Sequence, residues 1–393
     1  MKTLLSQSEA RHLALYHQGL FTSDVPSDKT GTLASLERLG YVQIDTISVV
    51  ERAHHHILWS RQPDYQPSYL DELIADKTAF EYWSHAAAYL PMKDYRYSLL
   101  RKQLYAQNEA KHLPDKKMNQ YVLDRIQAEG ALKARDFEHS QKTGGWWEHK
   151  PAKRALEQLF LEGKLMIARR VNFQKVFDLT ERVLPAEVET TIPSTDEFSR
   201  HLIFSAINAH GFASVEEISY LRGGNMRKAI QKLVTVLCES GELLPVSVEN
   251  SKQLYYSTAK NLSTLGQSIT ETTHILSPFD NTVIQRKRLL QLWDFDYQIE
   301  CYVPEPKRKF GYFCLPIMMG GHFIGRIDAK AERRTKQLII NSLHIEKEWT
   351  SDFHALAGAI LRFAKFNGCT TISITETYPS IIKQKLEKII LFC

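Results

Sequence analysis

One order of segments, helices followed by a strand-rich hairpin, occurs three times in this sequence. In the first copy, apolar residues recur at helical spacing up to Ala75, and an aromatic, strand-like stretch runs from Phe80 to Leu90. The later copies follow at a spacing of roughly seventy to ninety residues, and their candidate hairpins are Lys164–Phe177 and Leu243–Tyr256. Because this is the order of a winged helix, the repeat predicts a tandem array of DNA-binding modules.

The pattern changes beyond Ser257, where short apolar stretches alternate with turns. Strands are predicted over Tyr297–Val303, Phe310–Met318, His322–Ala329 and Gln337–Leu343. Ser277–Asp280 is typical of a helix start, with Ser277 as the cap and Pro278 in the first helical position. The predicted fold class is therefore α+β, with three tandem winged-helix modules followed by a small antiparallel β-barrel-like C-terminal region, together forming a concave surface.

A chain of 393 residues is long enough for about two to four domains. The repeats predict four: 1–112, the first winged-helix module, which carries the polar pair described next; 113–190, the second module; 191–262, the third module; and 263–393, a β-barrel-like domain with terminal helices.

The polar pair is Gln43 and Asp45, in a stretch that follows a short helical run ended by Gly40. If this stretch is extended, both side chains project from the same face, and a carboxylate and a carboxamide could hold a water molecule together. Asp45 could instead cap a helix that begins near Thr46. Against this alternative, Ser48 and Glu51 already form a capping-box pattern for the next helix.

The formal net charge of +5 and the isoelectric point of about 8.7 suit a polyanionic partner. Trp146 and Trp147 lie among the basic residues and could stack on bases or pack in a core. The turn Arg222–Gly224 opens a helix and could bind a phosphate or remain a solvated turn. The candidate DNA-contacting residues are Lys150, Arg169, Arg170, Arg227, Lys228, Lys307 and Arg308.

Five cysteines without a CxxC motif or even pairing indicate a reducing compartment. The sequence has no long apolar run, so we expect a cytoplasmic protein without membrane contact. We also expect a monomer that is associated with the nucleoid. Three adjacent histidines, His54–His56, would point in three directions around a helix and cannot bind one ion as a set. We therefore expect no metal and no cofactor.

Several motifs resemble those of one family. They are Tyr41–Thr46 (YVQIDT), Glu81–His85 (EYWSH), Leu276–Asn281 (LSPFDN), and Phe295–Tyr297 (FDY) followed by Tyr302–Arg308 (YVPEPKR). Each motif alone is weak, but their combination over most of the chain resembles the YcaQ-type branch of the AlkZ-like bacterial DNA glycosylases.

The resemblance implies tandem winged helices, a β-barrel-like C-terminal part and a monofunctional DNA glycosylase acting on double-stranded DNA. The implied substrates are N7-alkylated guanine and interstrand crosslinks of the nitrogen-mustard type, which the enzyme would unhook. The catalytic pair of the family falls on Gln43 and Asp45, in its aspartate branch. His85 and Trp83 are possible further site residues, but the chain departs from the family at Ala86, where an acidic residue is common.

The chemistry of such a substrate agrees with this pair. An N7-alkylated guanine is already cationic, so it leaves the sugar without a strong general acid. An ionised Asp45 would stabilise the positive charge that builds on the sugar, and Gln43 would orient the attacking water. A crosslinked base cannot be flipped freely, so we expect a shallow cleft on the DNA-facing surface.

Two alternatives from other classes agree with the repeat. One is a winged-helix transcription regulator that binds DNA without catalysis, and the other is a structural or repair-scaffold DNA binder. In both, Gln43 and Asp45 would be packing or capping residues.

Overall fold

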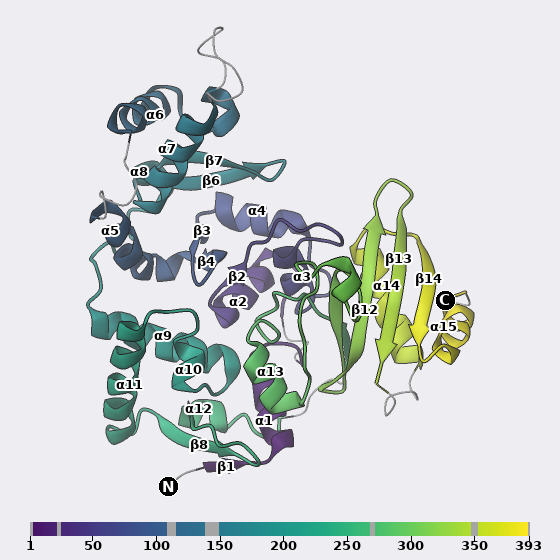
Figure 1. Cartoon of the computed structure of the whole chain (residues 1–393). Coiled ribbons are helices and arrows are strands. Elements are labelled where there is room, and N and C mark those ends of the chain that lie inside the picture. Colours follow the sequence, from purple (N-terminus) through teal and green to yellow (C-terminus); the bar gives the residue numbers. More distant parts are fainter. Residues whose placement is uncertain are drawn as a thin grey trace.

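The computed structural model describes residues 3–21, 25–107, 115–137, 149–267, 272–346 and 353–391. Within these ranges, one order of elements occurs three times: a helix, a short strand, further helices and a hairpin (Figure 1). In the third unit the short strand is reduced to a single bridge between Ala213 and Tyr256. The predicted repeat of helices and hairpins is therefore present in the structure.

The first unit contains α2 (Lys29–Leu39), β2 (Val42–Gln43), α3 (Ala53–Trp59), α4 (Pro67–Ala75), β3 (Ala79–Trp83) and β4 (Ala87–Pro91). β2 and β3 both pair antiparallel with β4, the central strand of this sheet. As predicted, Gly40 ends α2, in a left-handed conformation with a φ of 75°. A Cβ atom at Gly40 would lie 2.6 Å from Ser205 Oγ of the third unit, so a side chain here would also collide with that unit.

The segment between β2 and α3 is not helical, which corrects the capping box predicted at Ser48 and Glu51. The N-cap of α3 is Arg52, and within the described part of the chain no side chain caps this helix. The segment is tied instead to the C-terminal sheet, because Val49 O accepts a hydrogen bond of 2.9 Å from Ala331 N–H. The sheet therefore fixes the course of the chain beyond β2.

The second and third units follow the first along the chain. The first and second are joined by η1 (Met92–Ser98) and α5 (Leu99–Gln107). The second contains α6 (Lys116–Glu129), β5 (Leu132–Lys133), η2 (Ala134–Phe137), α7 (His149–Leu161), β6 (Leu165–Val171), β7 (Gln174–Leu179) and α8 (Thr180–Val183). The third contains α9 (Thr195–His210), α10 (Val215–Ile218), α11 (Gly224–Glu239), β8 (Leu244–Val248), β9 (Tyr255–Ser257) and α12 (Ala259–Leu262). Trp146 and Trp147 lie outside the described residues.

The C-terminal region is built on a sheet with the strand order β10-β11-β12-β13-β14. Its elements are β10 (Thr273–Ile275), α13 (Arg286–Trp293), η3 (Glu305–Lys307), β11 (Cys314–Met319), β12 (His322–Glu332), β13 (Gln337–Ile345), α14 (Phe353–Phe366), β14 (Thr371–Tyr378) and α15 (Ile381–Leu391). β14 pairs parallel with β13, since α14 carries the chain back between them. The described strands form an open sheet, which corrects the predicted barrel-like region (Figure 1).

Two further predictions for this region are wrong. Ser277–Asp280 forms a turn, and α13 begins only at Arg286; Tyr297–Val303 is not a strand. The side chains that suggested a helix cap have other partners. Ser277 Oγ accepts a hydrogen bond of 3.2 Å from Phe279 N–H, and Asp280 binds an arginine of the first unit.

Two apolar cores cross the boundaries between these units. One combines residues of the first unit, such as Val42, with residues of the C-terminal sheet, such as Ile317. The other joins α1 (Gln7–His17) to the third unit and the C-terminal region, and it contains Leu13 and Phe212. The strand that carries the polar pair is thus anchored in the core of the C-terminal sheet, while the division into four domains stays a prediction.

A buried ion pair joins the first unit to the C-terminal region. Arg61, just after α3, donates hydrogen bonds of 2.7 and 3.0 Å to Asp280, and neither side chain is more than 1% exposed. Gln18 extends the pair, because its Oε1 accepts from Arg61 and Thr282 while its Nε2 donates to Ala209 O of α9. This network connects α1, the first unit, the third unit and the C-terminal region at one buried point.

The ion pair makes the stability of the fold depend on pH. Burial alone would raise the pKa of Asp280, but the charge and hydrogen bonds of Arg61, with hydrogen bonds from Thr282, outweigh it and lower the pKa. The pair is therefore stabilising above the carboxyl's ordinary pKa of 3.8, and this contribution is lost as the pH falls through the lowered value.

We expect Asp280→Asn to lower the free energy of unfolding by about 3–5 kcal/mol at pH 7, because it leaves the Arg61 charge buried without a partner. Urea denaturation measures this change. As the control, Asp76→Asn removes a carboxylate that pairs with Lys29 on the surface at 2.6 Å, and should cost less than about 1 kcal/mol. Equal effects of the two substitutions would contradict the central role of the buried pair.

Candidate active site

The candidate site is built on β2, at the edge of the first sheet. Gln43 lies opposite Ala88 of β4, and Ile44 N–H donates a hydrogen bond of 2.8 Å to Ala87 O. The extended backbone predicted for this stretch is therefore present from Val42 to Ile44. The side chain of Gln43 is largely buried, with the residue only 8% exposed.

The hairpin between β3 and β4 brings His85 to Gln43. Ser84 N–H donates to Ala86 O at 2.9 Å within this turn, and His85 Nε2 lies 3.1 Å from Gln43 Oε1. Because an amide oxygen only accepts hydrogen bonds, His85 donates from a protonated Nε2. The amide NH2 of Gln43 is then turned away from His85 and is left to bind another group.

Aromatic rings surround His85 and fix its plane. The ring centroids of Tyr41 and Tyr220 lie 5.0 and 5.6 Å from that of His85, both in edge-on contact. Burial, and then the nearby charge of Arg222, lower the pKa of His85 to about 4. At neutral pH, His85 is therefore an uncharged donor that positions Gln43.

Asp45 lies two residues beyond Gln43 and closes a local turn. Its Oδ1 accepts a hydrogen bond of 2.7 Å from Ile47 N–H, which leaves Oδ2 for another partner. The alternative that Asp45 caps a helix near Thr46 is wrong, because α3 begins only at Ala53. Asp45 is half-buried, and burial raises the pKa of its carboxyl, although the hydrogen bond from Ile47 opposes this.

Neighbouring units hold the strand and the hairpin in place. Asn281, in the C-terminal region, donates from Nδ2 to Tyr41 O at 3.2 Å. Glu81 of β3 binds Arg170 of the second unit through two hydrogen bonds of 2.7 Å. The Tyr82 hydroxyl donates to a backbone carbonyl of α7 at 2.7 Å. The motifs around Glu81 and Asn281 therefore support the polar pair from two sides.

The predicted DNA-contacting residues are spread over three parts of the molecule. Arg169 is exposed at a bulge of β6, Arg227 and Lys228 are exposed at the start of α11, and Lys307 is exposed in η3. Arg308 is half-buried and donates from Nε to Val303 O at 2.9 Å. Trp83 is 38% exposed at the end of β3, and the Arg101 guanidinium lies 5.0 Å from the centroid of its ring.

Two of the predicted contacts need a different description. The guanidinium of Arg170 is bound by Glu81 and lies 4.4 Å from the ring centroid of Phe173, so it joins two units and we do not assign it to DNA. Lys150 belongs to α7, but its side chain lies outside the described residues.

Tyr302 is a candidate site residue that the sequence alone did not single out. It is 74% exposed, and its pKa is raised by burial, then by the charges of Cys301 and Asp45. Its loop is fixed by Glu300, whose carboxylate accepts hydrogen bonds from the backbone N–H groups of residues 309–311. The only earlier signal was its position at the start of the YVPEPKR motif.

A cavity of about 540 Å³ lies beside His85, between the first and third units. Gln43 does not line it, but the hydrogen bond to His85 connects Gln43 to its wall. The aromatic and cationic residues of its lining include Tyr41, Trp83, His85, Tyr97, Arg101, Phe198, Tyr220 and Arg222.

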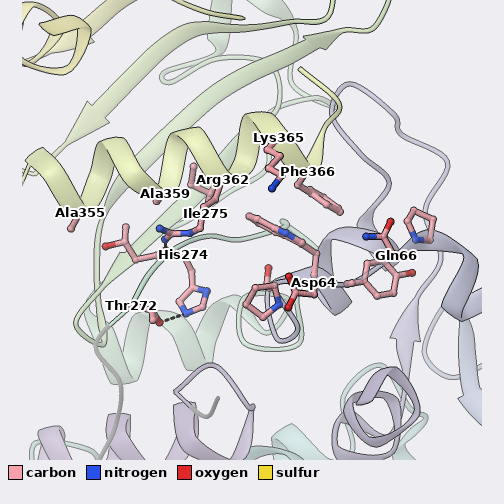
Figure 2. A pocket seen from close by; sticks show the side chains of 16 residues that line it. Asp64, Gln66, Thr272, His274, Ile275, Ala355, Ala359, Arg362, Lys365 and Phe366 are labelled. Atoms are coloured by element: carbon pink, nitrogen blue, oxygen red, sulfur yellow. Dashed lines mark hydrogen bonds between the residues drawn. The ribbon is translucent and has the colours of Figure 1, made fainter. Parts of the chain in front are cut away.

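A second cavity, of about 560 Å³, lies between the first unit and α14 of the C-terminal region (Figure 2). Arg362 and Lys365 extend toward it from α14, and His274 lies opposite, bonded to Thr272 (Figure 2). Neither Gln43 nor Asp45 lines this cavity, so we treat it as separate from the candidate site.

Comparisons with known proteins agree with this fold. The family model described as DNA glycosylase AlkZ-like matches residues 36–366. The solved structure of Streptomyces sahachiroi DNA glycosylase AlkZ is similar in fold, with a TM-score of 0.65 and 16% sequence identity. The match covers 95% of this chain and 100% of that chain.

The protein is therefore a DNA glycosylase, a hydrolase that acts on N-glycosyl bonds. More narrowly, the chain belongs to the AlkZ-like DNA glycosylase family, because the family model matches most of its length. The resemblance inferred from the sequence motifs is confirmed. The family match also argues against the alternative of a transcription regulator without catalysis.

The described residues contain neither a metal-binding cluster nor a helix that could span a membrane. No group of three or more His, Cys, Asp or Glu side chains there is arranged to hold a metal ion. In the same ranges, no helix is long and apolar enough to cross a membrane.

We expect nuclear magnetic resonance of the histidine rings to show His85 protonated on Nε2 and titrating near pH 4. Arg222→Met should raise this pKa toward 6.5, because it removes a nearby positive charge. Arg200→Met is the control, since Arg200 is paired with Glu242 and should leave His85 unchanged. Titration of wild-type His85 near 6.5 would contradict the described environment.

Proposed function

We propose that this glycosylase excises N7-alkylguanine from double-stranded DNA and also unhooks interstrand crosslinks of the nitrogen-mustard type. The supporting observation is a half-buried carboxylate, Asp45, two residues from an amide, Gln43, that His85 holds in one orientation. An alkylated, cationic base leaves as a neutral molecule, so the site has no need to protonate it. This proposal assigns the chain to the aspartate branch of the family.

The two side chains divide the work between them. As the bond to the base breaks, positive charge builds on the sugar, and the Asp45 carboxylate stabilises it. Asp45 Oδ2 and the Gln43 NH2 hold the attacking water, with Asp45 accepting from the water and Gln43 donating to it. His85 acts as a positioning residue, because its hydrogen bond sets which end of the amide faces the water.

The open surroundings of Asp45 suit a crosslinked base. Asp45 is only half-buried, and the nearby Tyr302 is mostly exposed. A guanine tied to the opposite strand cannot enter a deep pocket, so it must react close to the surface of the enzyme. In this arrangement Tyr302 contacts the displaced base or its neighbour.

The three repeated units are proposed to be winged-helix modules. Together they would form a concave surface on which the protein, as a monomer, binds one duplex. Exposed cations of the second unit, the third unit and the C-terminal region, namely Arg169, Arg227, Lys228 and Lys307, would contact phosphates together with Arg308. The first unit carries the catalytic pair, with Trp83 near the DNA. Such an enzyme works in the cytoplasm on the nucleoid and needs no cofactor or metal.

We expect Asp45→Asn to lower single-turnover release of N7-methylguanine by at least about 100-fold, because the charge is lost. The affinity for DNA should stay within about twofold, since a neutral amide still accepts the hydrogen bond from Ile47. A gel assay that detects alkali-labile abasic sites measures release, and fluorescence anisotropy measures binding.

The control for this substitution is Asp64→Asn, an exposed carboxylate at the second cavity. It should release the base at the wild-type rate. Retained activity in Asp45→Asn would overturn the assignment of Asp45. An intact alkylated duplex after incubation with the wild-type protein would overturn the proposed substrate, and one mustard crosslink in the same assay tests unhooking.

A further inference from the structure

Two arginines beside the candidate site have no carboxylate partner among the described residues. Among these residues, Arg222 makes no side-chain hydrogen bond or ion pair, and its guanidinium lies 5.5 Å from the centroid of the Phe198 ring. The side-chain hydrogen bonding of Arg101 there is limited to a 3.4 Å contact with the Tyr105 hydroxyl; its buried Nε is unsatisfied, and its guanidinium lies near the Trp83 ring. Both line the cavity of about 540 Å³ that also contains His85. They come from α5 and from the loop before α11, so separate parts of the chain bring them together.

Two fully buried arginines among the described residues are neutralised by carboxylates. Arg61 binds Asp280, and Arg288 binds Glu217 at 2.9 Å. Arg222 is different: burial and the neighbouring charge of Arg101 lower its pKa to about 10. Two partly desolvated cations that repel each other are costly, and a bound anion would remove this cost.

The backbone next to Arg222 also favours an anion. Gly223 is the N-cap of α11, a helix of 16 residues, and no side chain of the described residues caps it. A Cβ atom at Gly223 or Gly224 would meet nothing within 4 Å, so packing does not require glycine at either position. Open N–H groups at the start of a long helix, next to a guanidinium that has no carboxylate partner among the described residues, are suited to a phosphate that approaches the backbone closely.

The backbone just before Arg222 is strained. Leu221 has a φ of 54°, a left-handed conformation that leucine rarely adopts, and it is 70% exposed. Leu221 and Arg222 both line the cavity, so the strained backbone at Leu221 forms part of its wall.

We propose that Arg222, Arg101 and the N-terminus of α11 bind one phosphodiester of the DNA strand that carries the damaged base. The position of this phosphate next to the target nucleotide rests on the proposed function. The preference of the site for a phosphate rests on the charges alone. By holding that phosphate near His85, the site fixes the sugar of the target nucleotide relative to Gln43 and Asp45.

The first test measures binding to undamaged duplex, which does not depend on excision. Arg222→Met should weaken binding roughly tenfold and reduce the salt dependence by about one phosphate contact. Arg200→Met, which removes an arginine paired with Glu242, should change neither. Equal affinities of wild type and Arg222→Met would overturn the anion site whatever the substrate is.

The second test locates the phosphate. In the Asp45→Asn background, single phosphates around one N7-methylguanine are replaced by uncharged methylphosphonates. At one position next to the lesion, the replacement should weaken binding roughly tenfold, but not in a protein that also carries Arg222→Met. Additive effects at every position would overturn the assignment to one phosphate.

Further outcomes show whether Arg222→Met damages the fold and whether the proposed substrate is wrong. Arg222 makes no hydrogen bond that the fold needs, so Arg222→Met should melt at or above the wild-type temperature. If Arg222→Met melts at a lower temperature than the wild type, Arg101→Met tests the same phosphate contact independently. If binding to undamaged duplex weakens but no position near the lesion is special, the anion site stands and the proposed substrate fails.

Discussion

The buried pair of Arg61 and Asp280 fixes the geometry on which the candidate site depends. It lies where α1, the first and third units and the C-terminal region meet. The residue after Asp280, Asn281, donates to Tyr41 O, at the start of the strand that carries Gln43. A buried ion pair adds little net stability over an apolar contact, but breaking it is costly, so it selects one arrangement of these parts. The position of the strand is thus set from the C-terminal region.

A second ion pair fixes the hairpin from the opposite side. Glu81 and Arg170 join β3 to the second unit, and the same hairpin carries His85 to Gln43. The EYWSH motif therefore has two roles along its length. Its first residues join units, and its last residue positions the amide of Gln43. This explains how a surface site can hold an amide in one orientation without a deep pocket.

The sequence predicted the local features of this molecule better than its long-range contacts. The end of α2 at Gly40 follows from local chemistry, and so does the extended backbone from Val42 to Ile44. The Arg61–Asp280 pair joins residues 219 positions apart, and no pattern in the sequence marks either as the partner of the other. Long-range pairing and strand order are not local properties of a sequence. The sequence therefore predicts a helix start at Asp280 and a barrel-like region, where the structure has an ion pair and an open sheet.

Burial connects the electrostatics of the site to its proposed chemistry. It keeps His85 uncharged and raises the pKa of Asp45, so a carboxylate that must be ionised to act loses its charge at a higher pH than an ordinary aspartate. The most direct measurement is the single-turnover rate of N7-methylguanine release between about pH 4 and 8. The rate should fall on the acidic side with an apparent pKa above 3.8, the ordinary value for this carboxyl, and stay level toward pH 8. A rate that is unchanged down to about pH 4 would contradict catalysis by an ionised Asp45.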